Sequence, residues 1–336
     1  MLRTLLTLTL LASTTLTDAR MPGEPGSSHT ALWLRPPATA EALTRTLVEA
    51  KRAGFSDVLL EGFYHGRAAW TSQVAPMKLS YDAVATAAEV ARREGLHLNV
   101  WFETLYWRPA EQFGIPVTPL WQDRYATRTA AGQASLELSR LGFVDPASPE
   151  VGALLEGLVR ELGQQYPDVG LHLDYLRYPR EADFGYLPAA VDGFQRDTGL
   201  DALSLRRTEA DGQPSTQWQR WTSYRQQQIT RLADRLIGAY HDAGGDGMVS
   251  AAVFGASDPL QNWRGWHGLD AAMPMLYYPV LGLYQLARFR FPPSEQVWPG
   301  IEVGAGRPAL HQQLDYLHRL GYRNVSVFGW TPESRP

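Results

Sequence analysis

The feature that most constrains the fold is a repeated unit of apolar strand, loop, amphipathic helix and glycine. Three helix-to-strand junctions are near copies of one another, at residues 53–58 (AGFSDV), 94–100 (EGLHLNV) and 320–325 (LGYRNV). Each follows basic residues in the last helical turn with a glycine that can adopt a left-handed conformation, and then with a strand. Strands that alternate with helices run parallel and are joined by crossovers, so the sequence predicts an α/β protein.

Eight segments are predicted to be strands, and helical segments separate most of them. They lie at 31–35, 57–62, 97–103, 169–174, 248–254, 271–277, 297–303 and 324–330. Helix starts are predicted at Thr39, Ser80 and Ser148-Pro149, and the longest helix is predicted over about 215–241. Eight such units fit a (β/α)8 barrel, the TIM barrel, as a single domain over 31–336 with no room for a full final helix. An open doubly wound sheet is the alternative, but no Gly-x-Gly-x-x-Gly follows the first strand.

Alternation along the strands predicts which side chains face the barrel interior. On the third strand Trp101 and Glu103 share one side with His97, and on the fourth His172 shares a side with Asp174. Polar groups in an interior cost stability unless they are paired, so a polar interior indicates a site. We expect His172 to be a hydrogen-bonded core residue, with contact to Asp174 as the alternative.

Four carboxylates stand at predicted strand ends: Glu61, Glu103, Asp174 and Glu302. Barrel closure would bring them to one mouth, where mutual repulsion leaves some protonated and others ionised. Glycoside cleavage uses such a division, because one carboxylic acid protonates the leaving oxygen while a carboxylate attacks or activates water. We predict Asp174 as a catalytic residue. By analogy with barrel glycosidases that carry acids on strands four and seven, Glu302 is the preferred partner, with Glu103 and Glu61 in reserve.

Other residues near this mouth are predicted to bind substrate. Aromatic rings would offer flat faces to sugars, and arginines would orient carboxylates or substrate. The predicted set comprises Arg35, Glu61, Trp101, Tyr175, Arg177, Tyr178, Tyr277, Tyr278 and Trp330. The alternative for each acid is a structural salt bridge with an arginine such as Arg35 or Arg177.

The segment 170–179, GLHLDYLRYP, resembles the fourth-strand signature of the glycosyl-hydrolase-like 10 family, in which the strand ends in Asp followed by Tyr-x-Arg-Tyr-Pro. Weaker resemblances follow in the expected order at 31–34, 100–102, 144–151 and 270–278. The resemblance covers about 31–279 and selects Asp174. It implies a barrel enzyme of bacterial envelopes that acts on glycans, with peptidoglycan stripped of its peptides as one family substrate. Met275 departs from the pattern, because the family tends to have Gln there.

Composition disfavours several other functions. The 31 Lys and Arg against 35 Asp and Glu give a net charge of −4, so no basic face for nucleic acid is indicated. The chain has no cysteine, which excludes disulfides, thiolate metal sites and a thiol nucleophile.

Sequence motifs for a phosphate-binding loop, a zinc protease and a serine hydrolase are absent. No two of the eight histidines lie two to four positions apart, which disfavours a local metal site, although carboxylate-bound calcium stays open. We expect no cofactor and no metal.

The first residues are typical of an export signal. Met1-Leu2-Arg3 is a short positive start, residues 5–12 are mostly apolar, and Thr17-Asp18-Ala19 offers a cleavage site. We predict a signal peptide over 1–19 and a flexible leader over 20–30, with a disordered or mis-started N-terminus as the alternative. No later segment approaches the roughly 20 apolar residues of a spanning helix. We therefore expect a secreted, periplasmic or envelope protein without a membrane span.

These features predict a glycoside hydrolase that acts on an envelope or extracellular polysaccharide, or on an oligosaccharide. Two alternatives stay open. A barrel that binds glycans or scaffolds a cell-wall complex without cleaving would be favoured if each carboxylate were locked to its own arginine. A polysaccharide lyase or deacetylase on the same fold would be favoured by a metal at the mouth.

Overall fold

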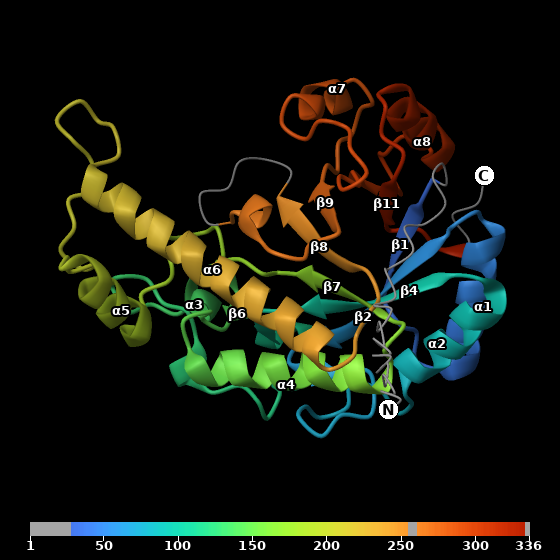
Figure 1. Cartoon of the computed structure of the whole chain (residues 1–336), viewed down its shortest axis with the longest axis horizontal. Helices are drawn as coiled ribbons and strands as arrows, with labels where there is room; N and C mark the ends of the chain where they lie inside the picture. The colour runs from blue at the N-terminus through green and yellow to red at the C-terminus, as the bar shows by residue number, and fades with distance from the viewer. Residues whose placement is uncertain (1–27, 255–260, 333–336) are drawn as a thin grey trace, which may run out of the picture.

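Eight parallel strands close into a barrel, which confirms the predicted (β/α)8 fold (Figure 1). The structure is a computed structural model that describes residues 28–254 and 261–332. Around the ring the strands follow chain order, and the last pairs with the first. They are β1 (Thr30–Leu34), β2 (Asp57–Tyr64), β4 (His97–Glu103), β7 (Gly170–Asp174), β8 (Val249–Phe254), β9 (Ala271–Met275), β10 (Gly300–Glu302) and β11 (Val325–Phe328).

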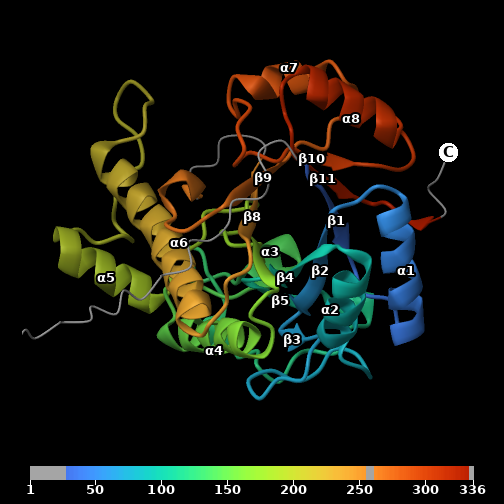
Figure 2. The ribbon, with the colours of Figure 1, turned by 45° about the vertical axis from the view of Figure 1, so that its right-hand side comes forward.

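Helices surround the barrel and connect its strands. The principal ones are α1 (Ala40–Arg52), α2 (Ala83–Glu94), α4 (Pro149–Gln165), α6 (Thr216–Asp242), α7 (Leu283–Arg288) and α8 (Leu310–Arg319). Figures 1 and 2 show α1 beside α2 and α4 beside α6, while α7 and α8 cover a third side. Between β8 and β9 the described residues hold only a short 3-10 turn, η3 (Trp263–Gly265). No α-helix follows β11 among the residues described, which end at Pro332, and the predicted signal peptide lies outside them.

Local hydrogen bonds explain where the helices begin. Thr39 and Ser148 accept backbone N–H groups at the starts of α1 and α4, as predicted from the sequence. The prediction that α2 begins after Ser80 is wrong by two residues. Asp82 caps this helix instead, because its carboxylate accepts the N–H of Ala85 at 2.8 Å and also that of Thr71 at 2.8 Å. Gly95 then ends α2 with φ 66°, the left-handed conformation expected of the junction glycine.

Two insertions follow strands, on the side where a barrel builds its site. Between β4 and β7, the strands β5 (Tyr106–Pro109) and β6 (Leu141–Phe143) pair antiparallel, with η1 (Glu111–Phe113), η2 (Asp123–Tyr125) and α3 (Ser135–Ser139) between them. After β7, α5 (Pro188–Thr198) packs on the first half of α6 around a small separate core. A short strand β3 (Arg67–Ala68) also folds back on β2. Trp221 is fully buried in this α5–α6 core.

The main apolar core lies between the barrel and its helices, and a smaller one fills the barrel interior. The interior core comprises Ala31, Trp33, Leu59, Trp101, Ala252, Ala271, Met273 and Trp298. Within the described ranges, none of the helices combines the length and apolar character needed to cross a membrane.

Candidate active site at the barrel mouth

A cavity of about 180 Å3 opens at the carboxyl-terminal ends of the strands. Its lining includes six residues that the sequence had selected for this mouth: Arg35, Trp101, Asp174, Tyr175, Arg177 and Tyr277. The remaining wall is largely apolar and comprises Trp33, Ala252, Met275 and Phe328. Trp33 and Phe328 were missed as site residues, although strand alternation places both on inward faces and so offered a signal.

Asp174 is the acid that reaches this cavity. It ends β7 directly opposite Glu103 on β4, so the two side chains share the inward face of adjacent strands. Its carboxylate accepts the indole N–H of Trp101 at 3.2 Å and the backbone N–H of Tyr175 at 2.6 Å. Burial raises the pKa of Asp174 to about 6, and these two hydrogen bonds with the Arg177 charge limit the rise.

Two residues with left-handed backbone hold the acids in place. Tyr175 and His65 both have φ 51°, a conformation that costs a non-glycine residue about 1–3 kcal/mol. The N–H of Tyr175 donates to Asp174, and the N–H of His65 donates to Glu103 at 3.3 Å. The strained backbone therefore serves the same purpose at both positions, because it turns an N–H group toward a carboxylate.

Glu61 and Glu103 are buried next to this site but do not line the cavity. Burial, reinforced by the charges of Glu61 and Asp174, holds the pKa of Glu103 well above its usual range. Burial also raises the pKa of Glu61 to about 7, although Arg35 opposes the rise through a 3.3 Å hydrogen bond. His65 lies 3.6 Å from Glu103, but burial and the nearby cations lower the pKa of His65 to about 4 and leave it neutral.

Glu302, the predicted partner of Asp174, stands at the end of β10 outside the cavity lining. It forms an ion pair with Arg307, whose guanidinium also donates to the carbonyl of Tyr277 at 2.9 Å. Burial, with the charges of Asp174 and Glu302, raises the pKa of Tyr277. Both acids therefore act on Tyr277, whose ring stacks on Phe328 at 6.0 Å.

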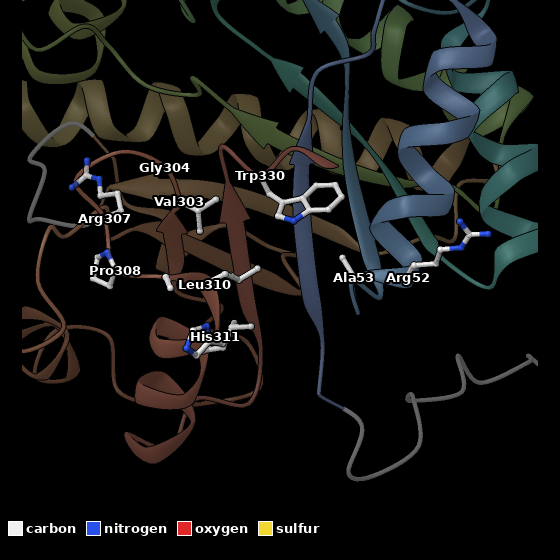
Figure 3. A pocket seen from close by; sticks show the side chains of 11 residues that line it. Arg52, Ala53, Val303, Gly304, Arg307, Pro308, Leu310, His311 and Trp330 are labelled. Carbon is white, nitrogen blue, oxygen red and sulfur yellow. The ribbon is translucent and has the colours of Figure 1, made fainter. Parts of the chain in front are cut away.

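Trp330, predicted to bind substrate at the mouth, lies elsewhere. It lines a larger cavity of about 730 Å3 outside the barrel, between the end of α1 and helix α8 (Figure 3). The predicted alternation fails because Gly329 has φ 84°, which turns the chain after β11. The Trp330 ring then packs edge-on against Phe55 at 5.1 Å.

Tyr178 and Tyr278 are also absent from the cavity lining. Tyr178 is buried, and a Cβ added at Gly185 would lie 3.0 Å from its ring. Tyr278 packs against Tyr284 at 5.3 Å. Both residues follow the ends of their strands, where alternation no longer fixes the direction of a side chain.

His172 is a core histidine, as expected, and does not bond to Asp174. Its Nε2 accepts the indole N–H of Trp33 at 3.0 Å, so the ring proton sits on Nδ1 and faces the Ser250 hydroxyl at 2.9 Å. Burial lowers the pKa of His172 to about 3, which leaves the ring neutral below the cavity floor.

The barrel with several acids at its carboxyl-terminal mouth is of the glycosidase-like class. A family model described as "Glycosyl hydrolase-like 10" matches residues 56–282, and the chain belongs to this family. This match confirms the family that the fourth-strand signature indicated.

Solved structures support the fold. The catalytic domain of β-amylase from Paenibacillus polymyxa has a TM-score of 0.58 at 11% identity, covering 92% of this chain and 94% of that one. A β-galactosidase from the haloarchaeon Halorubrum lacusprofundi has a TM-score of 0.64 at 12% identity over 90% of this chain and 52% of that one. A β-galactosidase from Marinomonas ef1 has a TM-score of 0.63 at 11% identity, covering 90% of this chain and 54% of that one. The chain thus spans about half the length of these β-galactosidases. No curated protein sequence matches it.

Proposed function

We propose that the protein is a glycoside hydrolase that cleaves a polysaccharide at the barrel mouth, with Asp174 as the catalytic carboxylate and Glu103 as the general acid. The observation that carries this proposal is the position of the two acids, side by side on β4 and β7 in environments that separate their proton affinities. With a pKa of about 6, Asp174 is largely ionised at neutral pH, whereas burial and the neighbouring carboxylates raise the pKa of Glu103 and so favour its protonated form. Such a division identifies the base or nucleophile and the acid of a glycosidase.

The chemistry requires two coordinated events at one bond. The Asp174 carboxylate attacks the anomeric carbon or takes a proton from an attacking water, while the Glu103 carboxylic acid gives its proton to the leaving oxygen. Because Glu103 is buried beside the cavity and does not line it, this proton transfer requires a side-chain movement or a bridging water. Trp101 and the Tyr175 N–H stabilise the ionised Asp174. Glu302 is the alternative acid, because it adjoins Tyr277, which lines the cavity.

The pattern of ion pairs favours catalysis over glycan binding alone. Glu61 is hydrogen-bonded to Arg35 and Glu302 is paired with Arg307. Among the residues that the structure describes, however, no Lys or Arg lies within ion-pair distance of Asp174 or Glu103. A purely structural set of acids would have each charge neutralised, whereas two of these four acids keep raised pKa values without such a partner.

For the substrate, we propose an envelope or extracellular polysaccharide, with peptidoglycan stripped of its peptides as the leading candidate. The family membership and the aromatic wall of Trp33, Trp101, Tyr175 and Tyr277 support a glycan. The export-like N-terminal sequence supports action outside the cytoplasm, in the periplasm, envelope or medium. Separating cell fractions and detecting the intact chain would test this location.

The test is incubation of the purified protein with denuded peptidoglycan and bacterial exopolysaccharides, with products identified by mass. Hydrolysis adds one water to each cleaved bond, a lyase leaves an unsaturated end without added water, and a deacetylase changes mass without shortening the chain. We expect hydrolysis by the wild type and its loss in Asp174→Asn. The matched control is Asp123→Asn, because Asp123 also accepts an indole N–H, from Trp121 at 2.8 Å, but is exposed on a surface turn. Equal turnover by Asp174→Asn and the wild type would refute the assignment.

Substrates with different leaving groups distinguish which of the two candidate residues is the general acid. Replacement of the true acid by glutamine should abolish cleavage of the natural glycan yet retain much of the activity on an activated aryl glycoside, whose leaving group needs no proton. We expect this pattern for Glu103→Gln and not for Glu302→Gln. The reverse result would assign the acid to Glu302.

A further inference from the structure

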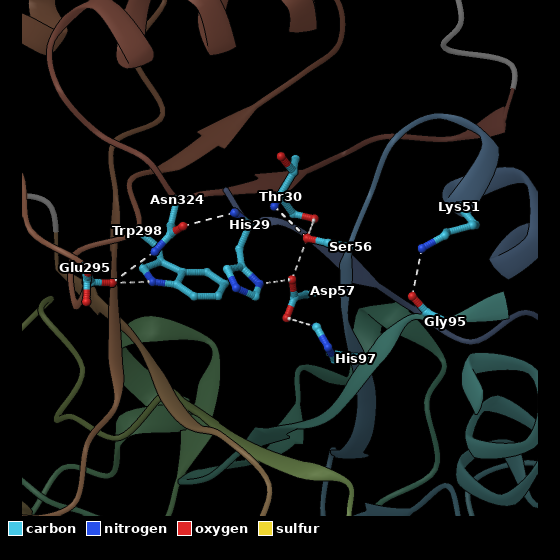
Figure 4. A network of polar contacts seen from close by, with 10 residues as sticks. All are labelled: His29, Thr30, Lys51, Ser56, Asp57, Gly95, His97, Glu295, Trp298 and Asn324. Atoms are coloured by element: carbon cyan, nitrogen blue, oxygen red, sulfur yellow. Dashed lines mark hydrogen bonds and ion pairs between the residues drawn. The ribbon is translucent and has the colours of Figure 1, made fainter. Parts of the chain in front are cut away.

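A second cluster of chemically capable side chains lies at the opposite end of the barrel from the cavity. His29, Asp57 and His97 each offer one ligand atom, and these atoms all lie within 4.8 Å of one another. Figure 4 shows the Asp57 carboxylate between the two imidazoles. The Nδ1 of His29 is 2.8 Å from one carboxylate oxygen, and the Nδ1 of His97 is 3.4 Å from the other.

Barrel closure creates this cluster from three separate segments. Asp57 begins β2 and is the direct partner of His97 at the start of β4, while His29 immediately precedes β1. The three strands are neighbours in the ring. Six residue steps separate His97 from Glu103 on the same strand, which places the cluster about 20 Å from the acids of the mouth. The cluster is therefore independent of the proposed glycosidase chemistry.

Outer contacts hold the ligands in position. The Ser56 hydroxyl donates to the Asp57 oxygen that also faces His29, at 2.6 Å. The backbone N–H of His29 donates to the amide oxygen of Asn324 at 3.0 Å, and its ring stacks on Trp298 at 5.1 Å. Such supporting contacts are characteristic of metal sites, where they fix the orientation of each ligand. His97 alone is exposed, with 68% of its side chain accessible, so its ring can rotate.

We propose that His29, Asp57 and His97 form a binding site for a divalent transition metal, with Zn²⁺ as the best-suited ion. Two imidazoles and one carboxylate are a ligand set that zinc accepts, with bonds of about 2.0–2.2 Å and therefore about 3.3 Å between ligand atoms in a tetrahedron. The two imidazoles lie 2.8 and 3.4 Å from different oxygens of Asp57, and one ligand atom from each of the three residues lies within 4.8 Å of the others, so small side-chain movements would bring all three to one ion. Rotation of the exposed His97 ring provides the remaining adjustment, and water completes the coordination.

The surroundings of the cluster favour a cation. The three ligands line a cavity of about 550 Å3, and Asp168 and Asp246 line the same cavity. Arg92 also lines this cavity and pairs with Asp168 at 3.7 Å, so Asp246 and Asp57 leave the lining with a net negative charge. Because the three ligands come from three neighbouring strands, a bound ion would tie together the amino-terminal ends of β1, β2 and β4. That end of a TIM barrel serves stability rather than catalysis, so the site is assigned a structural role.

The experiment is zinc titration of the full chain, carrying no added histidine tag and first stripped with a chelator. Calorimetry should give one Zn²⁺ per chain, and the melting temperature should rise with free zinc, since the ion binds only the folded barrel. Cobalt should produce the visible absorption of a low-symmetry site with nitrogen ligands, whereas Mg²⁺ should have no effect because it prefers oxygen ligands.

Two glutamine substitutions make the test specific. His97→Gln removes an exposed ligand and is expected to weaken zinc binding by more than about 100-fold, the upper end of the loss caused by removing an outer partner. His267→Gln is the matched control, because His267 also pairs with a carboxylate, Asp234 at 2.9 Å, but belongs to no three-residue ligand cluster within the described part of the chain. Absence of stoichiometric zinc binding by the wild type, or equal affinity in the wild type and His97→Gln, would overturn the proposal. His29→Gln provides the same test if His97→Gln fails to fold.

Discussion

At the residue scale, one cation acts on three acids of the mouth. Arg35 contacts Glu61 at 3.3 Å and lies over the Trp101 ring at 6.0 Å. Its charge opposes the burial that raises the pKa values of Glu61, Glu103 and Asp174. Although the Arg35 side chain is largely exposed, its charge therefore adds to the larger effects of the Tyr175 N–H, Arg177 and Trp101, which also lower the pKa of Asp174.

This arrangement predicts a shift in pH dependence. If Asp174 acts as a carboxylate, kcat/KM rises with pH through about 6, its pKa in the free protein. Arg35→Met keeps an apolar stem but removes the charge, so the pKa of Asp174 rises and the acidic limb moves to higher pH. Profiles of kcat/KM against pH would measure the shift. Arg160→Met, which removes a charge on α4 from a 3.9 Å ion pair, should leave the limb in place.

Residue-level prediction from the sequence succeeded where a strand fixes side-chain direction and failed beyond strand ends. Trp101 and Asp174 lie within strands, and both reach the cavity as predicted. Trp330 does not, because the left-handed Gly329 reverses the alternation. Local histidine spacing did not predict the His29–Asp57–His97 cluster, because its members come together only through strand pairing.

At the scale of elements, the space around a glycine determines whether alanine can replace it. A Cβ at Gly170, the first residue of β7, would lie 2.0 Å from Oδ1 of Asn99 and 2.4 Å from the carbonyl oxygen of Met248. By contrast, a Cβ at Gly238 on the exposed side of α6 would meet nothing within 4 Å. The same chemical change should therefore have opposite effects at the two positions.

We expect Gly170→Ala to lower the free energy of unfolding by about 1–3 kcal/mol, the typical cost of overpacking. Gly238→Ala should raise it by about 0.5–1 kcal/mol, because alanine loses less backbone entropy in a helix. Urea unfolding followed by circular dichroism measures both. A neutral effect of Gly170→Ala would mean that β4, β7 and β8 can separate without loss, contrary to their packing here.

Elements with a local signal were predicted well, and elements that depend on distant pairing were not. Caps such as Ser148 and the long α6 follow from neighbouring residues, and both match the structure. The antiparallel pair of β5 and β6 was not predicted, because both strands are short and a long insertion separates Tyr106 from its partner Phe143 in the chain.

At the scale of the whole molecule, the acids that suit the mouth for catalysis also weaken the fold. A carboxyl group whose pKa is higher in the folded than in the unfolded chain reduces stability once pH exceeds the unfolded value, and the full cost applies above the folded value. For Asp174 these values are 3.8 and about 6. The difference corresponds to about 3 kcal/mol of lost stability at neutral pH.

Asp174→Asn should therefore gain stability relative to the wild type as pH rises. The difference in free energy of unfolding between the two proteins should increase by up to about 3 kcal/mol between about pH 4 and about pH 7.5, because only the wild type must ionise a buried carboxyl group. Urea unfolding of both proteins across this range measures the change, and Asp123→Asn, altered at an exposed carboxylate, supplies a reference that should stay nearly constant. A pH-independent difference for Asp174→Asn would mean that Asp174 ionises without cost, and the separation of proton affinities assigned to Asp174 and Glu103 would lose its physical basis.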